Sequence, residues 1–201
     1  MDYSQFLIMR GEISLLLVFL LIFLFDTFGG KKSLKGLSIT ACVLFALHTV
    51  WNIIPVDSAT AFGGMYQTSP IASMVKTVLN IGTLIVLLQS ISWSDTPDVK
   101  LRRGEFYELL LVTLFGMYLM VSSGHFLLFF IGLETASLPM AALIAINKKD
   151  TESYEAGAKY LFTAVFSSAV FLLGLSFLYG GSASPGVGDI PVANASTHPP
   201  L

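Results

Sequence analysis

The stretch HFLLFFIGLETASLPMAALIAI, residues 125–146, decides the fold class of this chain. It is apolar over the length of a membrane span and carries one acidic residue, Glu134, near its middle. On insertion scales a charged residue at the centre of a transmembrane helix costs about 2.5 to 3.5 kcal/mol, so such groups usually face a bundle interior or a wet cavity and serve transport. Glu134 is therefore a candidate proton or ion carrier.

The composition of the whole chain is that of a membrane protein. Of its 201 residues, 54% are hydrophobic and 12% are charged, whereas soluble domains carry about 25% charged residues. Six stretches are apolar enough to cross about 30 Å of hydrocarbon, with approximate bounds 12–28, 34–54, 71–93, 105–122, 125–146 and 154–179. The sequence therefore predicts an all-α, polytopic bundle of six transmembrane helices over residues 1–180. Residues 181–201, rich in Gly, Pro, Ser and Ala, are expected to form a flexible, outward-facing tail.

Several features of the composition exclude other classes of function. The single cysteine, Cys42, and three widely separated histidines predict neither a disulfide framework nor a metal site. A net charge of −2 with scattered basic residues predicts no nucleic-acid partner. The chain has no Gly-rich phosphate loop after a strand and no set of cysteines for iron and sulfur. We therefore expect no redox centre and no bound cofactor in it.

The basic residues of the short loops predict an orientation in the membrane. Loops that hold several Lys and Arg residues, 29–35, 94–104 and 147–153, alternate with loops that hold none, 55–70 and 122–124. An excess of Lys and Arg in short loops marks the cytoplasmic side. The three basic loops are therefore expected in the cytoplasm, and both chain termini on the outer side.

The surroundings of Glu134 in the sequence favour a proton site. Pro139 removes a backbone donor and can kink the helix, which leaves carbonyl groups for neighbours, hydroxyls or water. Small residues on the same helix, Gly132, Ala136 and Ala141, allow another helix to approach closely. The structural alternative for Glu134 is a residue that holds two helices together by a hydrogen bond.

Two lysines are further candidates, each with a structural alternative. Lys159 lies four residues after Glu155, on the same helical face. It either couples to Glu134, directly or through water, or extends to the cytoplasmic headgroups while pairing with Glu155. Lys76, near the outward end of its helix, is a weak candidate for an exit path and fits the role of an interfacial anchor better. Glu12, at the outward start of the first helix, is expected to be interfacial as well.

Two motifs, in order along the chain, carry a resemblance to a known family. GLE-x-x-SLP occupies residues 132–139, and EA-x-x-KY occupies residues 155–160. The segment EFYELLL, residues 105–111, precedes them. From about residue 105 to residue 174 the chain resembles subunit N of bacterial NADH:quinone oxidoreductase, respiratory complex I, one of its antiporter-like membrane subunits.

The resemblance implies a function and site residues. Members transfer protons across the bacterial inner membrane, driven by quinone reduction elsewhere in the complex. The family's helix-five glutamate falls on Glu134, and its helix-six lysine falls on Lys159. The implied partners are the other membrane subunits of complex I and the lipid bilayer, with quinone only indirectly. NAD, FMN, iron–sulfur clusters and quinone are expected in partner subunits.

The resemblance also implies more helices than this chain supplies, including two inverted five-helix repeats. A chain of 201 residues is therefore expected to be a truncated gene product, a frameshifted reading or one half of a split subunit. Three functions stay open at this point: a proton-translocating subunit of complex I, a component of a multisubunit cation/proton antiporter, and a membrane scaffold that does not transport. The segment EFYELLL favours the first over the second.

Overall fold

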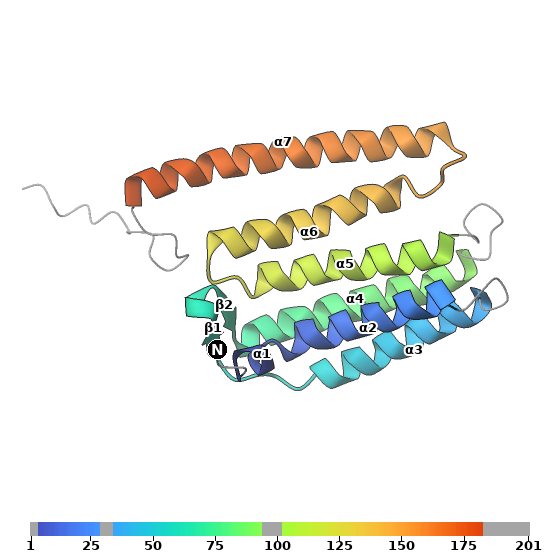
Figure 1. Ribbon diagram of the computed structural model, residues 1–201, viewed down its shortest axis with the longest axis horizontal. Helices are drawn as coiled ribbons and strands as arrows, with labels where there is room; N and C mark the ends of the chain where they lie inside the picture. The colour runs from blue at the N-terminus through green and yellow to red at the C-terminus, as the bar shows by residue number, and fades with distance from the viewer. Residues whose placement is uncertain (1–3, 29–33, 94–101, 183–201) are drawn as a thin grey trace, which may run out of the picture.

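The computed structural model describes residues 4–28, 34–93 and 102–182, which form long helices and one small sheet (Figure 1). The elements in chain order are α1 (Ser4–Ile8), α2 (Arg10–Phe28), α3 (Leu34–Asn52), β1 (Ala59–Ala61), η2 (Phe62–Gly64), β2 (Tyr66–Thr68), α4 (Pro70–Trp93), α5 (Arg103–Val121), α6 (Phe126–Ile144) and α7 (Thr151–Ser182). Within the described ranges, α2, α4, α5, α6 and α7 are long and apolar enough to cross a membrane, and α3 contains a shorter apolar stretch. The predicted polytopic helical fold is confirmed. From residue 183 onward, the predicted tail lies outside the described residues.

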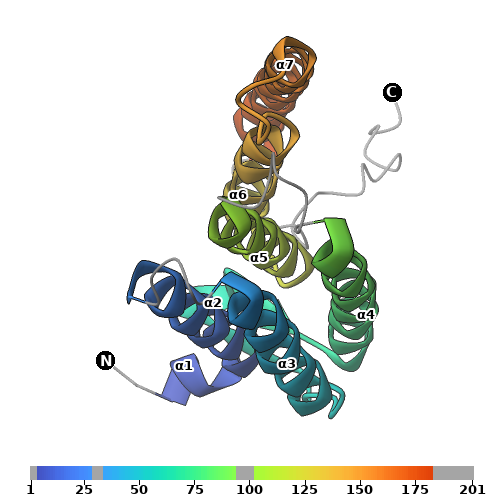
Figure 2. The same ribbon diagram turned by 90° about the vertical axis from the view of Figure 1, so that its right-hand side faces the viewer.

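The helices form a compact bundle with a layer attached to it (Figure 2). Helices α2, α3, α4 and α5 pack around a common core. Helix α6 packs on α5 and α7 packs on α6, so that these three helices form a row that leads away from the bundle.

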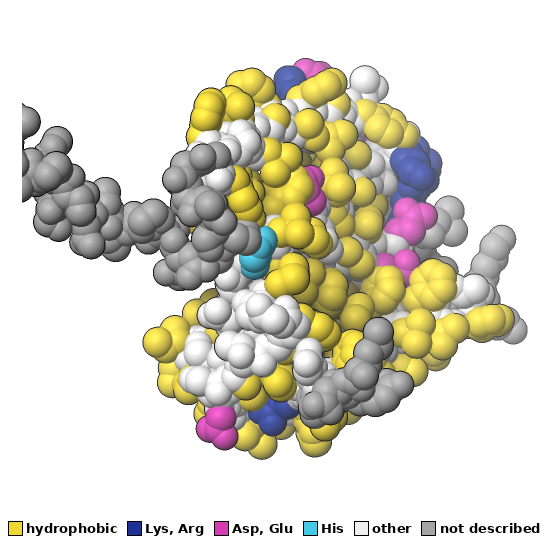
Figure 3. Space-filling model, turned by 60° about the vertical axis from the view of Figure 1, so that its left-hand side comes forward, with side chains coloured by type: hydrophobic (Ala, Val, Ile, Leu, Met, Phe, Trp, Pro, Cys, Tyr) yellow, Lys and Arg dark blue, Asp and Glu magenta, His cyan; other side chains and the backbone are white. Residues whose placement is uncertain are grey.

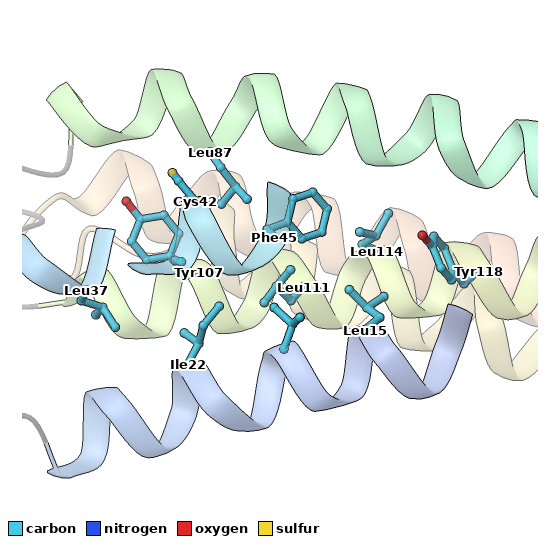
Figure 4. Close-up of a cluster of buried hydrophobic side chains, with 12 residues drawn as sticks. Leu15, Ile22, Leu37, Cys42, Phe45, Leu87, Tyr107, Leu111, Leu114 and Tyr118 are labelled. Carbon is cyan, nitrogen blue, oxygen red and sulfur yellow. The ribbon is translucent and has the colours of Figure 1, made fainter. Parts of the chain in front are cut away.

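The core of the bundle arises from apolar side chains at helical spacing. On α2, Leu15, Val18 and Ile22 recur at intervals of three and four residues, which places them on one face of the helix. This face packs against Phe45 of α3 and Leu111 of α5 (Figure 4). Cys42, the single cysteine, belongs to the same cluster. This packing joins α2, α3 and α4 to α5. It therefore fixes the positions of the ends of these helices, where polar residues lie.

A short antiparallel hairpin lies in the connection between α3 and α4, where the all-α expectation foresaw no strands. Strands β1 and β2 pair with Ala61 opposite Tyr66, and the turn between them uses Gly63 and Gly64 at φ values of 66° and 88°. Glycine adopts this left-handed region without steric penalty. The hairpin is fastened to the α5–α6 connection, because the backbone N–H of Gln67 donates to the carbonyl of Ser122 at 2.8 Å.

The α6–α7 layer exposes much of its apolar surface. On α7 the side chains of Phe162, Phe166 and Phe177 are each more than 70% exposed. One face of the molecule shows hydrophobic side chains over most of its area, with Lys and Arg near its edges (Figure 3). Such a surface fits a bilayer or neighbouring apolar helices rather than water.

Candidate functional site

Glu134 lies near the middle of α6. Its Oε1 atom is buried and has no hydrogen-bond partner among the described residues. A buried carboxylate oxygen without a donor is unfavourable, and proton uptake removes its charge. Among the described residues, no donor therefore offsets the burial of this oxygen.

Helix α6, which carries Glu134, approaches α5 unusually closely. A Cβ atom added to Gly116 of α5 would lie 2.4 Å from the backbone nitrogen of Ala136 and 2.6 Å from the carbonyl oxygen of Gly132. The predicted close approach through small residues on the Glu134 helix is thereby confirmed. It sets the place of Glu134 relative to the bundle.

Pro139 lies inside α6, which continues past it to Ile144. Because proline has no N–H, the carbonyl of Thr135 loses its helical donor. The hydroxyls of Thr135 and Ser137 donate to the carbonyls of Ile131 and Leu133, each at 2.7 Å. The turn around Glu134 therefore contains hydroxyl groups that donate hydrogen bonds to backbone carbonyls of the same helix.

Lys159 lies on the exposed side of α7 and does not form an ion pair with Glu134 in the described ranges. Its Nζ atom lies 2.5 Å from Oε1 of Glu155, and the two side chains are 73% and 62% exposed. Between α6 and α7 lies a cavity of about 220 Å³. Its lining includes Leu133, Ser137, Tyr160, Thr163, Ser167 and Ser168. The lining thus includes Leu133, which directly precedes Glu134, and Tyr160, which directly follows Lys159.

The structure corrects the interfacial interpretation of Lys76 and Glu12. Lys76 is 8% exposed and Glu12 is 1% exposed. The Nζ atom of Lys76 lies 2.5 Å from Oε1 of Glu12. An anchor to the headgroups would be exposed, so that interpretation is wrong for both residues. They form a buried ion pair between α2 and α4.

Two hydroxyls complete the surroundings of the Glu12 carboxylate. The phenol of Tyr66, on β2, donates to Oε2 of Glu12 at 2.8 Å, and the hydroxyl of Ser122 donates to Oε1 at 3.4 Å. Burial raises the pKa of Tyr66, so it keeps its proton and remains a donor. The sequence contained one signal for this cluster, namely two opposite charges near the ends of two predicted helices. Nothing in the sequence paired them.

The comparisons with known proteins agree with the helical arrangement. The protein family described as "NADH:quinone oxidoreductase/Mrp antiporter, TM" matches residues 123–193. NADH-quinone oxidoreductase subunit N of Phocaeicola vulgatus is 46% identical over 197 residues, which cover 98% of this chain and 42% of that protein. The same subunit of Azobacteroides pseudotrichonymphae is 41% identical over 94% of this chain and 40% of its own length. The resemblance of this chain to subunit N is thereby confirmed.

Solved structures share the fold of this chain. A chain of respiratory complex I from Thermus thermophilus with bound Aureothin superposes with a TM-score of 0.70 and 23% identity, over 89% of this chain and 38% of that chain. A chain of the membrane-bound sulfane sulfur reductase, an archaeal respiratory membrane complex, gives a TM-score of 0.64 at 19% identity, over 90% of this chain and 38% of that chain. The present sequence thus spans about two fifths of the length of the curated subunit N proteins that it matches.

Proposed function

We propose that this chain takes part in proton transfer across the membrane, as a membrane subunit of a proton-translocating NADH:quinone oxidoreductase. Quinone reduction elsewhere in the complex supplies the driving force, and the other membrane subunits of the complex are its partners. NAD, FMN, iron–sulfur clusters and quinone bind in those partner subunits. The proposal combines the similarity to subunit N with a carboxyl group in the middle of an apolar helix.

The observation that carries the proposal is the buried Oε1 atom of Glu134 in the middle of α6, which has no hydrogen-bond partner among the described residues. A group that only held two helices together would have its oxygens bonded to the neighbouring helix. The hydroxyl-lined cavity between α6 and α7 supplies space for water beside this helix. The test is proton uptake by sealed membrane vesicles that carry the assembled complex, with Glu134 replaced by Gln.

Lys159→Met is expected to lower proton uptake less than replacement of Glu134 does. Lys159 is exposed and already paired with Glu155, so a charge change there acts on Glu134 from a distance and through water. Uptake is measured in the same vesicles at equal content of assembled complex. Glu155→Gln is the control, because it removes the partner and keeps the ammonium. Equal uptake by Lys159→Met and wild type would leave Lys159 as a residue that reaches the headgroups.

We propose further that the chain lies in the bacterial inner membrane, with the basic connections in the cytoplasm and both termini on the outer side. A cysteine in Lys148→Cys should then resist an impermeant thiol reagent in intact cells, whereas one in Asp57→Cys, on the hairpin side, should react. Both positions are exposed, and the native Cys42 is buried. Labelling of Lys148→Cys from outside would reverse the orientation.

A further inference from the structure

A second polar cluster lies at the hairpin end of the bundle, away from α6 and α7. A cavity of about 20 Å³ opens there. Its polar lining consists of Arg10, Glu12, Asn52, Tyr66, Ser73 and Lys76, with Thr68 beside them. A cavity of this size holds about one water molecule, and these side chains offer it several hydrogen bonds. The Glu12–Lys76 ion pair therefore borders a space large enough for a water molecule at one end of the bundle.

Polar groups continue from this ion pair into the bundle. The Nζ atom of Lys76 lies 5.2 Å from the ring centroid of Tyr118. The Tyr118 hydroxyl donates to Oδ1 of Asn80 at 2.6 Å, one helical turn beyond Lys76 on α4. Nε2 of His48, on α3, lies 3.3 Å from the same hydroxyl. Since this hydroxyl donates to Asn80, it accepts from His48, which assigns the imidazole proton to Nε2.

The other nitrogen of His48 leads back toward the cavity. Nδ1 of His48 lies 3.0 Å from the hydroxyl of Ser14 and 3.2 Å from Nδ2 of Asn52, which itself lines the cavity. The imidazole thus joins the cavity to the interior hydroxyl of Tyr118, and an imidazole can accept a proton on one nitrogen and release one from the other. Every helix of the bundle contributes a side chain to this network.

We propose that Glu12 and Lys76 form a proton-exchange site that opens toward the hairpin side of the membrane and adjoins the His48–Tyr118 network. A buried ion pair is weak evidence for stability, because apolar residues of similar volume often serve the fold equally well. Ionisable residues inside a membrane bundle mark ion and proton pathways by default. The groups that face Glu12 are Lys76 from α4, Tyr66 from β2 and Ser122 at the end of α5, with Arg10 beside it on the cavity wall.

The first step of the exchange moves one proton within the pair and leaves the total charge of the pair at zero. A proton passes from Nζ of Lys76 to Oε1 of Glu12 across 2.5 Å, so that an N–H bond breaks and an O–H bond forms. The ion pair becomes a neutral amine and a carboxylic acid. The acid releases its proton to the water in the cavity, which becomes hydronium, and the pair then carries one negative charge. The charge returns to zero when the amine takes up a proton from a hydronium ion that enters the same cavity. Tyr66 and Ser122 hold the carboxyl group in place throughout.

The test uses the double variant Glu12→Gln/Lys76→Met in the assembled complex. It removes both charges together, so neither is left buried without a partner, which is the usual reason why single replacements destabilise. We expect normal assembly and a fall of at least half in protons taken up per quinone reduced. The control is Arg102→Met/Glu105→Gln, which removes an ion pair that borders solvent at the start of α5 and should leave uptake unchanged. Wild-type uptake by the Glu12→Gln/Lys76→Met variant would make the pair a structural clamp and overturn the proposal.

A spectroscopic measurement decides the case if the double variant assembles poorly. Glu12→Asp keeps a carboxyl group, and it should shift the carbonyl stretching band of a protonated acid in infrared difference spectra of the complex under turnover. A spectrum without any band that depends on Glu12 would also overturn the proposal. The outcome is separate from that for Glu134. Loss of uptake in the Glu12→Gln/Lys76→Met variant supports this site even if Glu134→Gln pumps normally. Normal uptake by the double variant together with loss of uptake in Glu134→Gln would remove this site alone.

Discussion

Glu134→Gln is expected to abolish proton uptake while the complex still assembles. Glutamine keeps the shape of the side chain and its capacity to accept a hydrogen bond, but it cannot take up or release a proton. Because Oε1 has no partner among the described residues, the replacement breaks no hydrogen bond that holds α6 in place. Assembly of the complex should therefore be close to normal, whereas proton uptake should be lost.

The measurement is proton uptake in sealed vesicles, normalised to assembled complex and compared with the rate of quinone reduction. Glu134→Asp is the matched control, because it shortens the side chain by one methylene but keeps a titratable carboxyl, and it should retain part of the uptake. Wild-type uptake by Glu134→Gln would reduce Glu134 to a structural residue. It would then favour a scaffold that does not transport.

Gly116→Ala is expected to destabilise the packing of α5 against α6 by about 1–3 kcal/mol, the range for overpacked interiors. A new Cβ atom would lie within 2.6 Å of two backbone atoms of α6, and backbone atoms of a packed helix cannot turn aside as the end of a long side chain can. The helices would have to separate, which would also shift the segment that carries Glu134. The measurement is the temperature at which the detergent-solubilised complex loses this subunit.

Gly82→Ala serves as the matched control for this replacement. Gly82 lies inside α4, and a Cβ atom there would meet nothing within 4 Å. Alanine is a better helix former than glycine by about 1 kcal/mol, so this variant should be as stable as wild type or more stable. If both variants lowered the dissociation temperature equally, the close approach of α5 and α6 would not be the cause.

The sequence predicted the features of the fold that depend on local composition. Apolar stretches of sufficient length predict membrane-spanning helices regardless of what packs beside them. The small residues around Gly132 likewise predicted a close contact between helices. Glu134 was identifiable for the same reason, since an acidic residue within an apolar stretch is conspicuous without knowledge of its neighbours. Whether it carries protons is for the transport measurements to decide.

The sequence did not predict which charges meet across the bundle. Glu12 and Lys76 each lie close to a helix end, where an exposed position costs little free energy. They turn inward only because α2 and α4 both pack against α5, which lets the Lys76 side chain reach Glu12. Tyr66 joins them because a hairpin of six paired residues folds back over the bundle. Such a hairpin is too short to be stable alone, so the strand propensities of its residues do not predict it.

The pairing of Glu12 with Lys76 has a consequence for the synthesis of the protein and its insertion into the membrane. The two residues are 64 positions apart, and at about 5–20 residues per second the ribosome needs about 3–13 s to make that length of chain. During this interval the acidic residue of the first long helix has entered the insertion machinery, while its basic partner has not yet been synthesised. Helix α2 can reach its final depth only after α4 arrives. The early and late helices of the nascent chain therefore settle in the bilayer as one cooperative unit rather than one after another.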